Sequence, residues 1–369
     1  MHEFEKACKM QARMGIMACL KGRLFYFHTF KSVLMKAEKI KKGNELFDSH
    51  FPLSSLWGEV IITSPFFCYD SCKEKCMYTS VNDYLQRTFN EKIYKIAIDA
   101  GFTCPNRDGT KGSGGCIFCS GNGSGDFAES RRLSVTEQIE AGKARVAGKK
   151  PGKYIAYFQA FTNTYAPVEV LRAKFSEAID NKDVVAISVA TRPDCLPDDV
   201  IELLGELNKK KPVWVELGLQ TIHDKTAKYI RRGYDLSIYD KAVRDLKEIG
   251  IPQIIVHVIL GLPGEDKDMM LETVRYVVKS GARGIKLQLL HVLEGTDLAK
   301  DYREGKFEAL SMEEYIDILM DCLKIIPDDM VVHRITGDGP KRDLIAPLWS
   351  GDKKRVLNAI NKAINTKKD

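Results

Sequence analysis

Three cysteines have the spacing of metal ligands. Cys104, Cys116 and Cys119 are arranged as CX11CX2C in a glycine-rich segment that follows a strand-like run. Three thiolates can ligate three irons of a [4Fe–4S] cluster and leave the fourth iron open to another molecule. The intervening glycines permit a tight wrap of the backbone. We therefore predict a [4Fe–4S] cluster on these three residues.

Two other interpretations of the cysteines were weighed. A zinc site usually needs four Cys or His ligands, and no histidine lies within 25 residues of this segment. A second group, Cys68, Cys72 and Cys76, has CX3CX3C spacing, which misses by one residue the CX3CX2C spacing common among radical enzymes that use S-adenosylmethionine (SAM). The predicted site therefore does not include this second group.

The elements that must position the cysteine segment alternate between strand and helix. Between them lie helix start signals such as the capping box Ser134-Val-Thr-Glu137, and helix stops at Gly250 and Gly281. The six strand-like runs are Ile93–Ile98, Tyr154–Phe158, Val184–Val189, Val213–Leu217, Ile254–Leu260 and Gly284–Leu290. Six βα units are too few for a closed eight-stranded barrel, so we predict an α/β fold built as a partial (β/α)6 TIM-type barrel.

Three regions follow from this pattern. Residues 77–300 form the predicted barrel, and residues 301–369 form a C-terminal α/β extension that packs on it. The extension includes a strand-like run at Met330–Ile335 and ends in a basic amphipathic helix. Residues 1–76 show no βα alternation and receive no fold assignment. They are interpreted either as an extension or as the result of a misplaced translation start, with Met77 as the natural one.

Composition bounds the class of protein. The 369 residues are 44% hydrophobic, contain ten cysteines and carry a formal net charge of +6. No run approaches the ~20 apolar residues of a membrane span, and the N-terminus lacks signal-peptide order. We expect a cytoplasmic protein that does not associate with a membrane. The excess basic charge lies in residues 1–76 and 331–369, a weak indication of nucleic-acid contact.

The motifs along the chain resemble a known family. The matching segments are Asn82-Asp-Tyr-Leu, Gly101-Phe-Thr-Cys-Pro-Asn-Arg-Asp-Gly-Thr, Gly115-Cys-Ile-Phe-Cys, Tyr157-Phe-Gln-Ala-Phe-Thr-Asn-Thr-Tyr-Ala, Thr191-Arg-Pro-Asp-Cys-Leu-Pro, Val215-Glu-Leu-Gly-Leu-Gln-Thr, His257-Val-Ile-Leu-Gly-Leu-Pro-Gly-Glu, Lys286-Leu-Gln-Leu-Leu-His and His333-Arg-Ile-Thr-Gly-Asp. Together they resemble bacterial radical SAM proteins related to the catalytic subunit of Elongator. The resemblance covers residues 77 to about 360, and the family lacks the Elongator subunit's acetyltransferase domain.

The resemblance implies SAM as a second cofactor and a set of residues that contact it. Gln159, Thr162 and Asn163 correspond to the segment that meets the methionine group, although the Gly-Gly-Glu of many radical SAM enzymes is absent. Ser188, Thr191, Arg192, Glu216 and Gln220 resemble the polar set for the ribose and the carboxylate. Gly261, Gly264 and Glu265 resemble the adenine-side turn, and His291 and His333 are candidate catalytic residues.

The family also implies a chemistry. SAM is cleaved at the cluster by one electron to give a 5′-deoxyadenosyl radical, which abstracts hydrogen from a substrate. The kinship to Elongator suggests a tRNA wobble uridine as substrate, and reduced flavodoxin or ferredoxin as electron donor is expected for the family. Two alternatives stay open: a radical SAM enzyme acting on a small metabolite or a protein, and a non-catalytic iron–sulfur or zinc module that binds RNA.

Overall fold

A computed structural model describes residues 77–121, 123, 125, 128–337 and 339–366. All of them belong to one compact unit, Lys75–Asp369. The predictions for residues 1–76, including Cys68, Cys72 and Cys76, lie outside the described residues.

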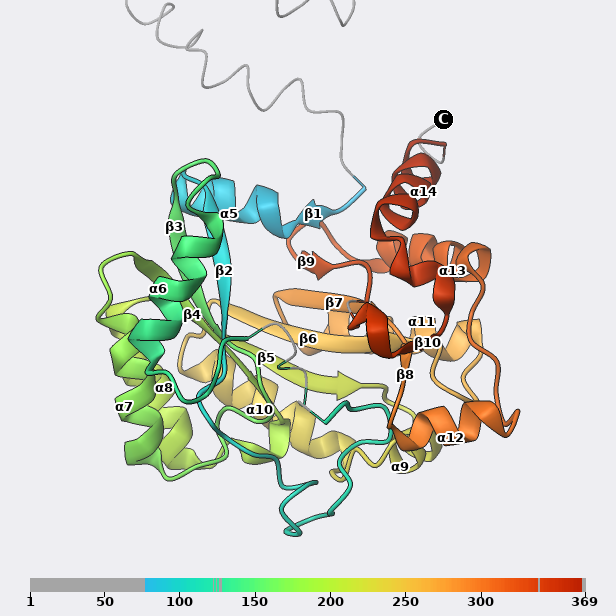
Figure 1. Cartoon of the computed structure of the whole chain (residues 1–369), viewed down its shortest axis with the longest axis horizontal. Coiled ribbons are helices and arrows are strands. Elements are labelled where there is room, and N and C mark those ends of the chain that lie inside the picture. Colours follow the sequence, from blue (N-terminus) through green and yellow to red (C-terminus); the bar gives the residue numbers. More distant parts are fainter. Residues whose placement is uncertain (1–76, 122, 124, 126–127, 338, 367–369) are drawn as a thin grey trace, which may run out of the picture. The chain divides into compact units, whose positions relative to one another are not determined.

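The centre of this unit is a curled sheet of eight parallel strands in the order β1-β9-β7-β6-β5-β4-β3-β2 (Figure 1). The strands are β1 (Thr79–Ser80), β2 (Ile93–Ile98), β3 (Lys153–Phe158), β4 (Val184–Thr191), β5 (Val213–Gln220), β6 (Gln253–Leu260), β7 (Gly284–Leu289) and β9 (Val331–Arg334). All six predicted barrel strands are present, and the predicted Met330–Ile335 run forms β9. The two-residue β1 was not predicted. Because β1 and β2 are the two edges of the sheet, the barrel is open, as six βα units require.

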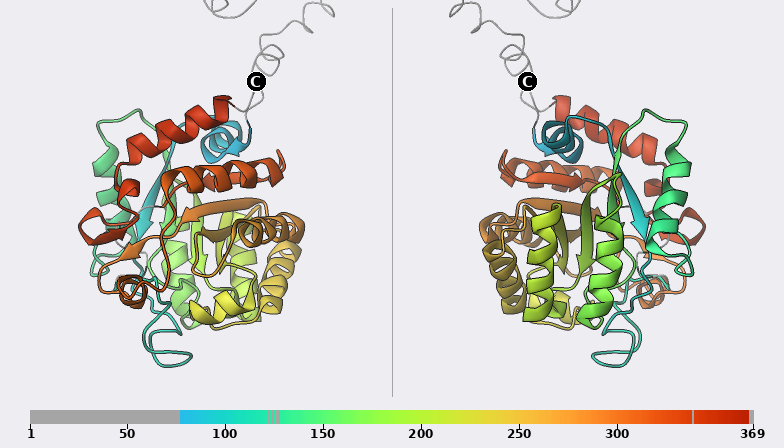
Figure 2. Two further views of the ribbon diagram at one scale, coloured as in Figure 1. Left: turned by 90° about the vertical axis from the view of Figure 1, so that its right-hand side faces the viewer. Right: turned by 90° about the vertical axis from the view of Figure 1, so that its left-hand side faces the viewer.

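Helices connect the strands and cover the outer face of the sheet (Figures 1 and 2). They are α5 (Val81–Phe89), α6 (Val135–Val146), α7 (Val168–Ile179), α8 (Asp198–Lys210), α9 (Asp224–Tyr229), α10 (Leu236–Glu248), α11 (Lys267–Ser280), α12 (Asp297–Arg303), α13 (Met312–Ile325) and α14 (Lys353–Thr366). The predicted capping box at Ser134 is present, with reciprocal bonds between Ser134 and Glu137. Helix α11 begins at Lys267 because Asp266 caps it through the Met269 amide.

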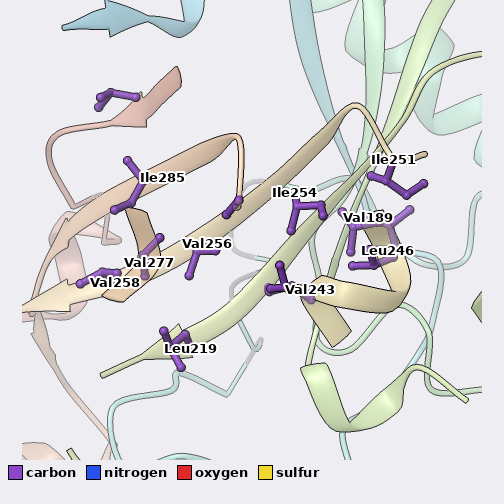
Figure 3. Packing of buried hydrophobic residues seen from close by; sticks show 14 of the residues in the cluster. Val189, Leu219, Val243, Leu246, Ile251, Ile254, Val256, Val258, Val277 and Ile285 are labelled. Atoms are coloured by element: carbon purple, nitrogen blue, oxygen red, sulfur yellow. The ribbon is translucent and has the colours of Figure 1, made fainter. Parts of the chain in front are cut away.

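The core between the sheet and the helices is apolar. Val189, Leu219, Ile254 and Val256 of the strands pack against residues of α10 and α11 such as Val243 and Val277 (Figure 3). Burying each such side chain contributes roughly 1.5–3 kcal/mol. Strands covered by helices on one face and filled on the other are apolar on both alternating faces, which explains their continuous hydrophobic runs.

The C-terminal elements join this same core. Ile318 and Leu319 of α13 and Val356 and Ile360 of α14 belong to the hydrophobic cluster that contains the strand residues. Helix α14 packs on α13 (Figure 2). A small antiparallel pair, β8 (Val292–Leu293) with β10 (Leu344–Ala346), lies beside the main sheet. No helix in the described ranges is long and apolar enough to cross a bilayer.

The barrel interior is layered, because side chains two residues apart on a strand point to the same face. One layer is apolar: Ile93, Ile155, Ala186, Trp214 and Ile255, from five adjacent strands, cluster with Leu85 of α5. Two residues further along each strand, the inward residues are polar. These are Lys95, Tyr157, Ser188, Glu216, His257 and, from β7, Lys286. We call this set the polar layer.

Candidate active site

One cavity lies at the carboxyl ends of β3, β4 and β5, and all three cysteines line it. Its wall includes Cys104, Cys116 and Cys119 of the loop after β2, together with residues at the three strand ends. The lining from the strands and the later loops is Tyr157, Gln159, Phe161, Thr162, Ala190, Thr191, Arg192, Glu216, Gly218, Gln220, Ile230, Arg232, Tyr234 and His257. Parallel βα units place functional loops at this end of the sheet.

The cysteine loop is held by its own polar groups. The Arg107 guanidinium donates to the carbonyls of Cys119, Ser120 and Gly121, which closes the loop on itself. The Asn106 amide donates to the Arg231 carbonyl at 2.6 Å and to Cys116 Sγ at 3.5 Å, tying the loop to the segment after α9. Gly115 has a positive φ of 76°, and a Cβ there would meet Arg107 Nε at 3.0 Å, so glycine is required.

The thiols fit an iron–sulfur cluster by their chemistry and placement. Burial raises the pKa of Cys116 to about 12, and the neighbouring thiol of Cys119 adds to the shift, so the thiolate at this position needs the positive charge of a bound metal. Three soft sulfur donors facing one cavity are the ligand set of an iron–sulfur cluster. Among the described residues, no three His, Cys, Asp or Glu side chains are close enough to hold a single metal ion. A cubane binds each sulfur at a separate iron, so its ligands need not converge on one point.

The structure brings part of the predicted SAM set to this cavity. Gln159, Thr162, Thr191, Arg192, Glu216 and Gln220 line it together with the cysteines. Gln220 has a positive φ of 70°, and its buried Oε1 has no hydrogen-bond partner among the described residues. A strained residue with an unsatisfied acceptor on a cavity wall is suited to a ligand donor.

Other members of the predicted set lie elsewhere. Asn163 is fully buried, and its Nδ2 donates to the Ala190 carbonyl at 2.9 Å, so it ties the segment after β3 to β4. Glu265 accepts from Thr221 Oγ1 at 2.5 Å, and burial raises its pKa. Gly261 packs against Leu310, and Gly264 has a positive φ of 82°. The proposed contacts of this turn with the adenine stay predictions.

Arg192 is already paired within the chain. Its Nε and Nη2 each donate to Asp194 at 2.9 Å, and Lys111 donates to the same carboxylate at 2.6 Å. Asp194 therefore takes two nitrogens of Arg192, a residue of the polar set predicted for the SAM ribose and carboxylate. Of the guanidinium nitrogens of Arg192, Nη1 is the one left for a ligand.

Arg232 was missed by the sequence reasoning. Its guanidinium is 3% exposed and donates to the backbone carbonyls of Thr221 (2.6 Å) and Tyr234 (3.1 Å), and it lies over the Tyr234 ring at 4.7 Å. No carboxylate of the described residues pairs with it, although it lines the cavity. A buried cation without a counterion favours a bound anion. The pattern Arg231-Arg232-Gly233 after α9 was the signal available in the sequence.

Glu216 is the centre of the polar layer and has a different environment from the one predicted. The fully buried carboxylate accepts from Lys95 (2.9 Å) and Ser188 (2.8 Å) on Oε1, and from Tyr157 (2.8 Å), His257 (2.8 Å) and Lys286 on Oε2. Five donors exceed the roughly four lone-pair sites of a carboxylate. Glu216 and Ser188 are thus occupied by each other and by the layer, and no lone pair is left for a ribose hydroxyl.

The polar layer shifts the ionisation of its members. The pKa of Glu216 is held well below its usual range: burial opposes the shift, and Lys286 and Lys95 outweigh it. Burial, reinforced by Lys95 and Arg334, lowers the pKa of Lys286 to about 7. Burial and Lys286 lower the pKa of His257 to about 4. At neutral pH, His257 is therefore an uncharged imidazole. Of the six residues of the polar layer, only Ser188 and Glu216 were in the predicted set.

The two candidate catalytic histidines do not line the cavity. His333 on β9 stacks edge-on against Trp214 of the apolar layer at 5.6 Å and lies 3.4 Å from Gln253 Oε1. His291 lies against the backbone positions Gly337 and Gly339. Their catalytic roles stay predictions that this placement does not favour.

Comparison with known proteins identifies the family. The radical SAM superfamily model matches residues 103–277, and the radical SAM C-terminal domain model matches residues 282–366. The uncharacterized protein YtqA of Bacillus subtilis is 51% identical over 302 residues, which are 82% of this chain and 93% of YtqA. Protein YhcC of Escherichia coli is 38% identical over 282 residues, which are 76% of this chain and 90% of YhcC. This chain belongs to the radical SAM superfamily, and its sequence is that of a YtqA and YhcC homologue.

The relationship to Elongator is more distant. Elongator complex protein 3 of Schizosaccharomyces pombe is 26% identical over 182 residues, which are 48% of this chain and 31% of that protein. The structure of Elp3 from the archaeon Methanocaldococcus infernus superposes with a TM-score of 0.55 at 19% identity, covering 73% of this chain and 63% of Elp3. The predicted family and the predicted partial barrel are both confirmed. Membership of this superfamily implies a [4Fe–4S] cluster and SAM as cofactors.

Proposed function

We propose that this chain cleaves SAM reductively at a [4Fe–4S] cluster bound by Cys104, Cys116 and Cys119, and that it abstracts hydrogen from an organic substrate. The single observation that carries this proposal is the shared cavity. The three cysteines line it together with Gln220, which offers an unsatisfied acceptor, and Arg232, which has no carboxylate partner among the described residues. When bound, a three-cysteine cluster supplies an open iron for SAM and the electron that cleaves it.

The residues of the chain have separable roles in this proposal. Asn106 and Arg107 hold the cysteine loop in place, and Gln220 accepts a donor from the ligand. Arg232, with Arg192 Nη1, binds the carboxylate of SAM.

The test is anaerobic reconstitution with iron and sulfide, followed by SAM and dithionite. We expect a brown protein with about four irons per chain that releases 5′-deoxyadenosine. The Cys119→Ala variant should bind less iron and release none. A colourless wild-type protein that holds one zinc per chain would contradict the proposal and would favour the non-catalytic alternative.

For the substrate, we propose a tRNA uridine, and for the electron donor a reduced flavodoxin or ferredoxin. The support for tRNA comes from relatives: the tRNA uridine(34) acetyltransferase of Methanocaldococcus jannaschii is 28% identical over 170 residues, which are 45% of this chain and 30% of that protein. Helix α14 also begins with Lys353, Lys354 and Arg355. Comparison of tRNA nucleosides from wild-type and deletion strains tests this; identical nucleoside profiles would favour a metabolite or protein substrate.

A further inference from the structure

The polar layer lies where a barrel normally has a packed hydrophobic core. Interior layers of βα barrels are usually filled by bulky branched residues, and the layer below the polar one follows that rule. Burying lysine, glutamate and histidine side chains costs free energy unless the groups are paired. A polar ring across six adjacent strands therefore needs a reason other than stability.

Small residues leave space above this ring. Two positions further along, three of the six strands carry the small residues Ala97, Ala190 and Gly218, of which Ala190 and Gly218 line the cavity. The other three strands carry Gln159, Ile259 and Gln288 at the same level. Tyr157, Glu216 and His257 of the polar layer line the same cavity. The polar layer is thus the floor of the cavity that the cysteines border, and the removal of side-chain volume above it makes this floor accessible.

His257 presents a defined acceptor at this floor. Its Nε2 lies 2.8 Å from Glu216 Oε2, and because that carboxylate is ionised, Nε2 carries the proton. The ring is neutral at pH 7, so Nδ1 holds a free lone pair. The His257 side chain is 18% exposed and lines the cavity. Glu216 consequently determines which ring nitrogen of His257 keeps the free lone pair.

Lys95 supplies donors in the same layer. Its ammonium uses one hydrogen for Glu216 Oε1 at 2.9 Å and lies over the Tyr157 ring at 4.6 Å. The side chain is 26% exposed and sits on the edge strand β2. Lys95 does not itself line the cavity, but its Nζ contacts two residues that do, Glu216 and Tyr157. Lys95 and Lys286 face one carboxylate, so the layer has more donor capacity than Glu216 satisfies. An electron-rich oxygen of a ligand would accept the hydrogen bonds that Glu216 leaves unused.

We propose that the polar layer binds the substrate, and that it selects a group in which an N–H or O–H donor stands beside a carbonyl or anionic oxygen. His257 Nδ1 accepts from the donor, and Lys95 Nζ donates to the oxygen. Glu216 is a positioning residue that orients both side chains. The inference rests on the proposed function, because it places the substrate in the cavity bordered by the cluster ligands.

The test uses two small probes on the reconstituted full-length protein in the presence of SAM. Succinimide offers an N–H between two carbonyls, whereas N-methylsuccinimide keeps both carbonyls and carries a methyl group in place of the donor hydrogen. Calorimetric titration should show about tenfold weaker binding of the methylated probe, the cost of one unmade hydrogen bond. The His257→Phe variant should weaken succinimide about tenfold and leave the two probes equal.

The matched control is His223→Phe. His223 precedes α9, and its Nε2 bonds to the Met269 carbonyl outside the cavity, so this variant should bind succinimide as the wild type does. If His257→Phe does not fold, 15N spectra of histidine-labelled wild-type protein give the same answer, since Nδ1 of His257 should shift on adding succinimide and not on adding N-methylsuccinimide.

Equal binding of the two probes, or no binding of succinimide, would overturn the proposal. The same preparation is assayed for 5′-deoxyadenosine to separate the two hypotheses. Release of 5′-deoxyadenosine without discrimination between the two probes refutes substrate binding by the polar layer and leaves the proposed function intact. Discrimination without 5′-deoxyadenosine refutes the proposed function and leaves the polar layer as a binding site.

Discussion

Arg192 and Asp194 form a two-point ion pair across a single intervening residue, with both nitrogen-to-oxygen distances at 2.9 Å. This pair neutralises the arginine that the sequence favoured as the anchor of a carboxylate. Forty residues later, Arg232 reaches the same cavity and holds only backbone carbonyls. Two buried arginines of one cavity thus differ in whether their charge is compensated, and this difference makes their roles separable by mutation.

Arg232→Met should weaken SAM binding by about tenfold or more, since a hydrogen bond to a charged group contributes about 1.5–3 kcal/mol. Equilibrium dialysis of SAM against the reconstituted protein measures this. Arg231→Met is the neighbouring control: its side chain is 50% exposed and pairs with Asp297, so SAM affinity should be unchanged. Equal losses in the two variants would remove Arg232 from the site.

Replacing any of Cys104, Cys116 or Cys119 by alanine should abolish the brown colour of the reconstituted protein and most of its bound iron, because two thiolates do not hold a cubane as three do. Cys322→Ala is the control, since Cys322 is a buried thiol on α13 and should keep full iron content. Iron analysis and visible absorption report the result. Retention of the cluster in a Cys104 variant would contradict the ligand assignment.

Asn106→Ala should lower the reduction potential of the cluster. The Asn106 amide donates to Cys116 Sγ, and a hydrogen bond to a ligand sulfur stabilises the reduced, more negative state. A redox titration monitored by paramagnetic resonance gives the midpoint. Thr110→Ala is the matched control. Thr110 lies in the same loop, but its hydroxyl contacts Tyr165, so this variant should leave the reduction potential unchanged.

Glu216→Gln should destabilise the fold by about 3–5 kcal/mol, because Lys95 and Lys286 would lose their buried counterion. Lys286→Met should cost far less, since Glu216 keeps Lys95, Tyr157, Ser188 and His257 as donors. Urea unfolding of the metal-free proteins compares the two. A larger loss in Lys286→Met than in Glu216→Gln would show that the layer is organised around the lysine instead.

Stability should rise with pH between about 7 and 10. The folded pKa of Lys286 is lowered to about 7 from an unfolded value of 10.5, so in this window the unfolded chain binds a proton that the folded chain does not. The free energy of unfolding therefore increases as the pH rises through the window. Lys286→Met should remove this part of the slope, and unfolding midpoints at pH 7, 8 and 9 test it.

The secondary structure could be predicted because its causes are local. The six strand runs, the Ser134 capping box and the stop at Gly281 each depend on residues a few positions apart, and all of them appear in the structure. The cysteine triad was found in the same way, since CX11CX2C lies in one loop. The short strand β1 was not found, because two residues carry no period and their pairing with β9 is set by the closing of the sheet.

Which residues of the cavity are paired with one another depended on tertiary contacts. The sequence alone specified the βα alternation, the cysteine segment and the family, because these are encoded by spacing and motif. Only the tertiary structure decided that Asp194 occupies Arg192, that Arg232 lacks a carboxylate partner in the described part of the chain, and that Glu216 gathers donors from five strands. The partners of Glu216 lie tens of positions or more away along the chain, so spacing in the sequence does not contain them. Arg192 and Asp194 are separated by one residue, and their pairing is set by the geometry of the two side chains in the folded chain.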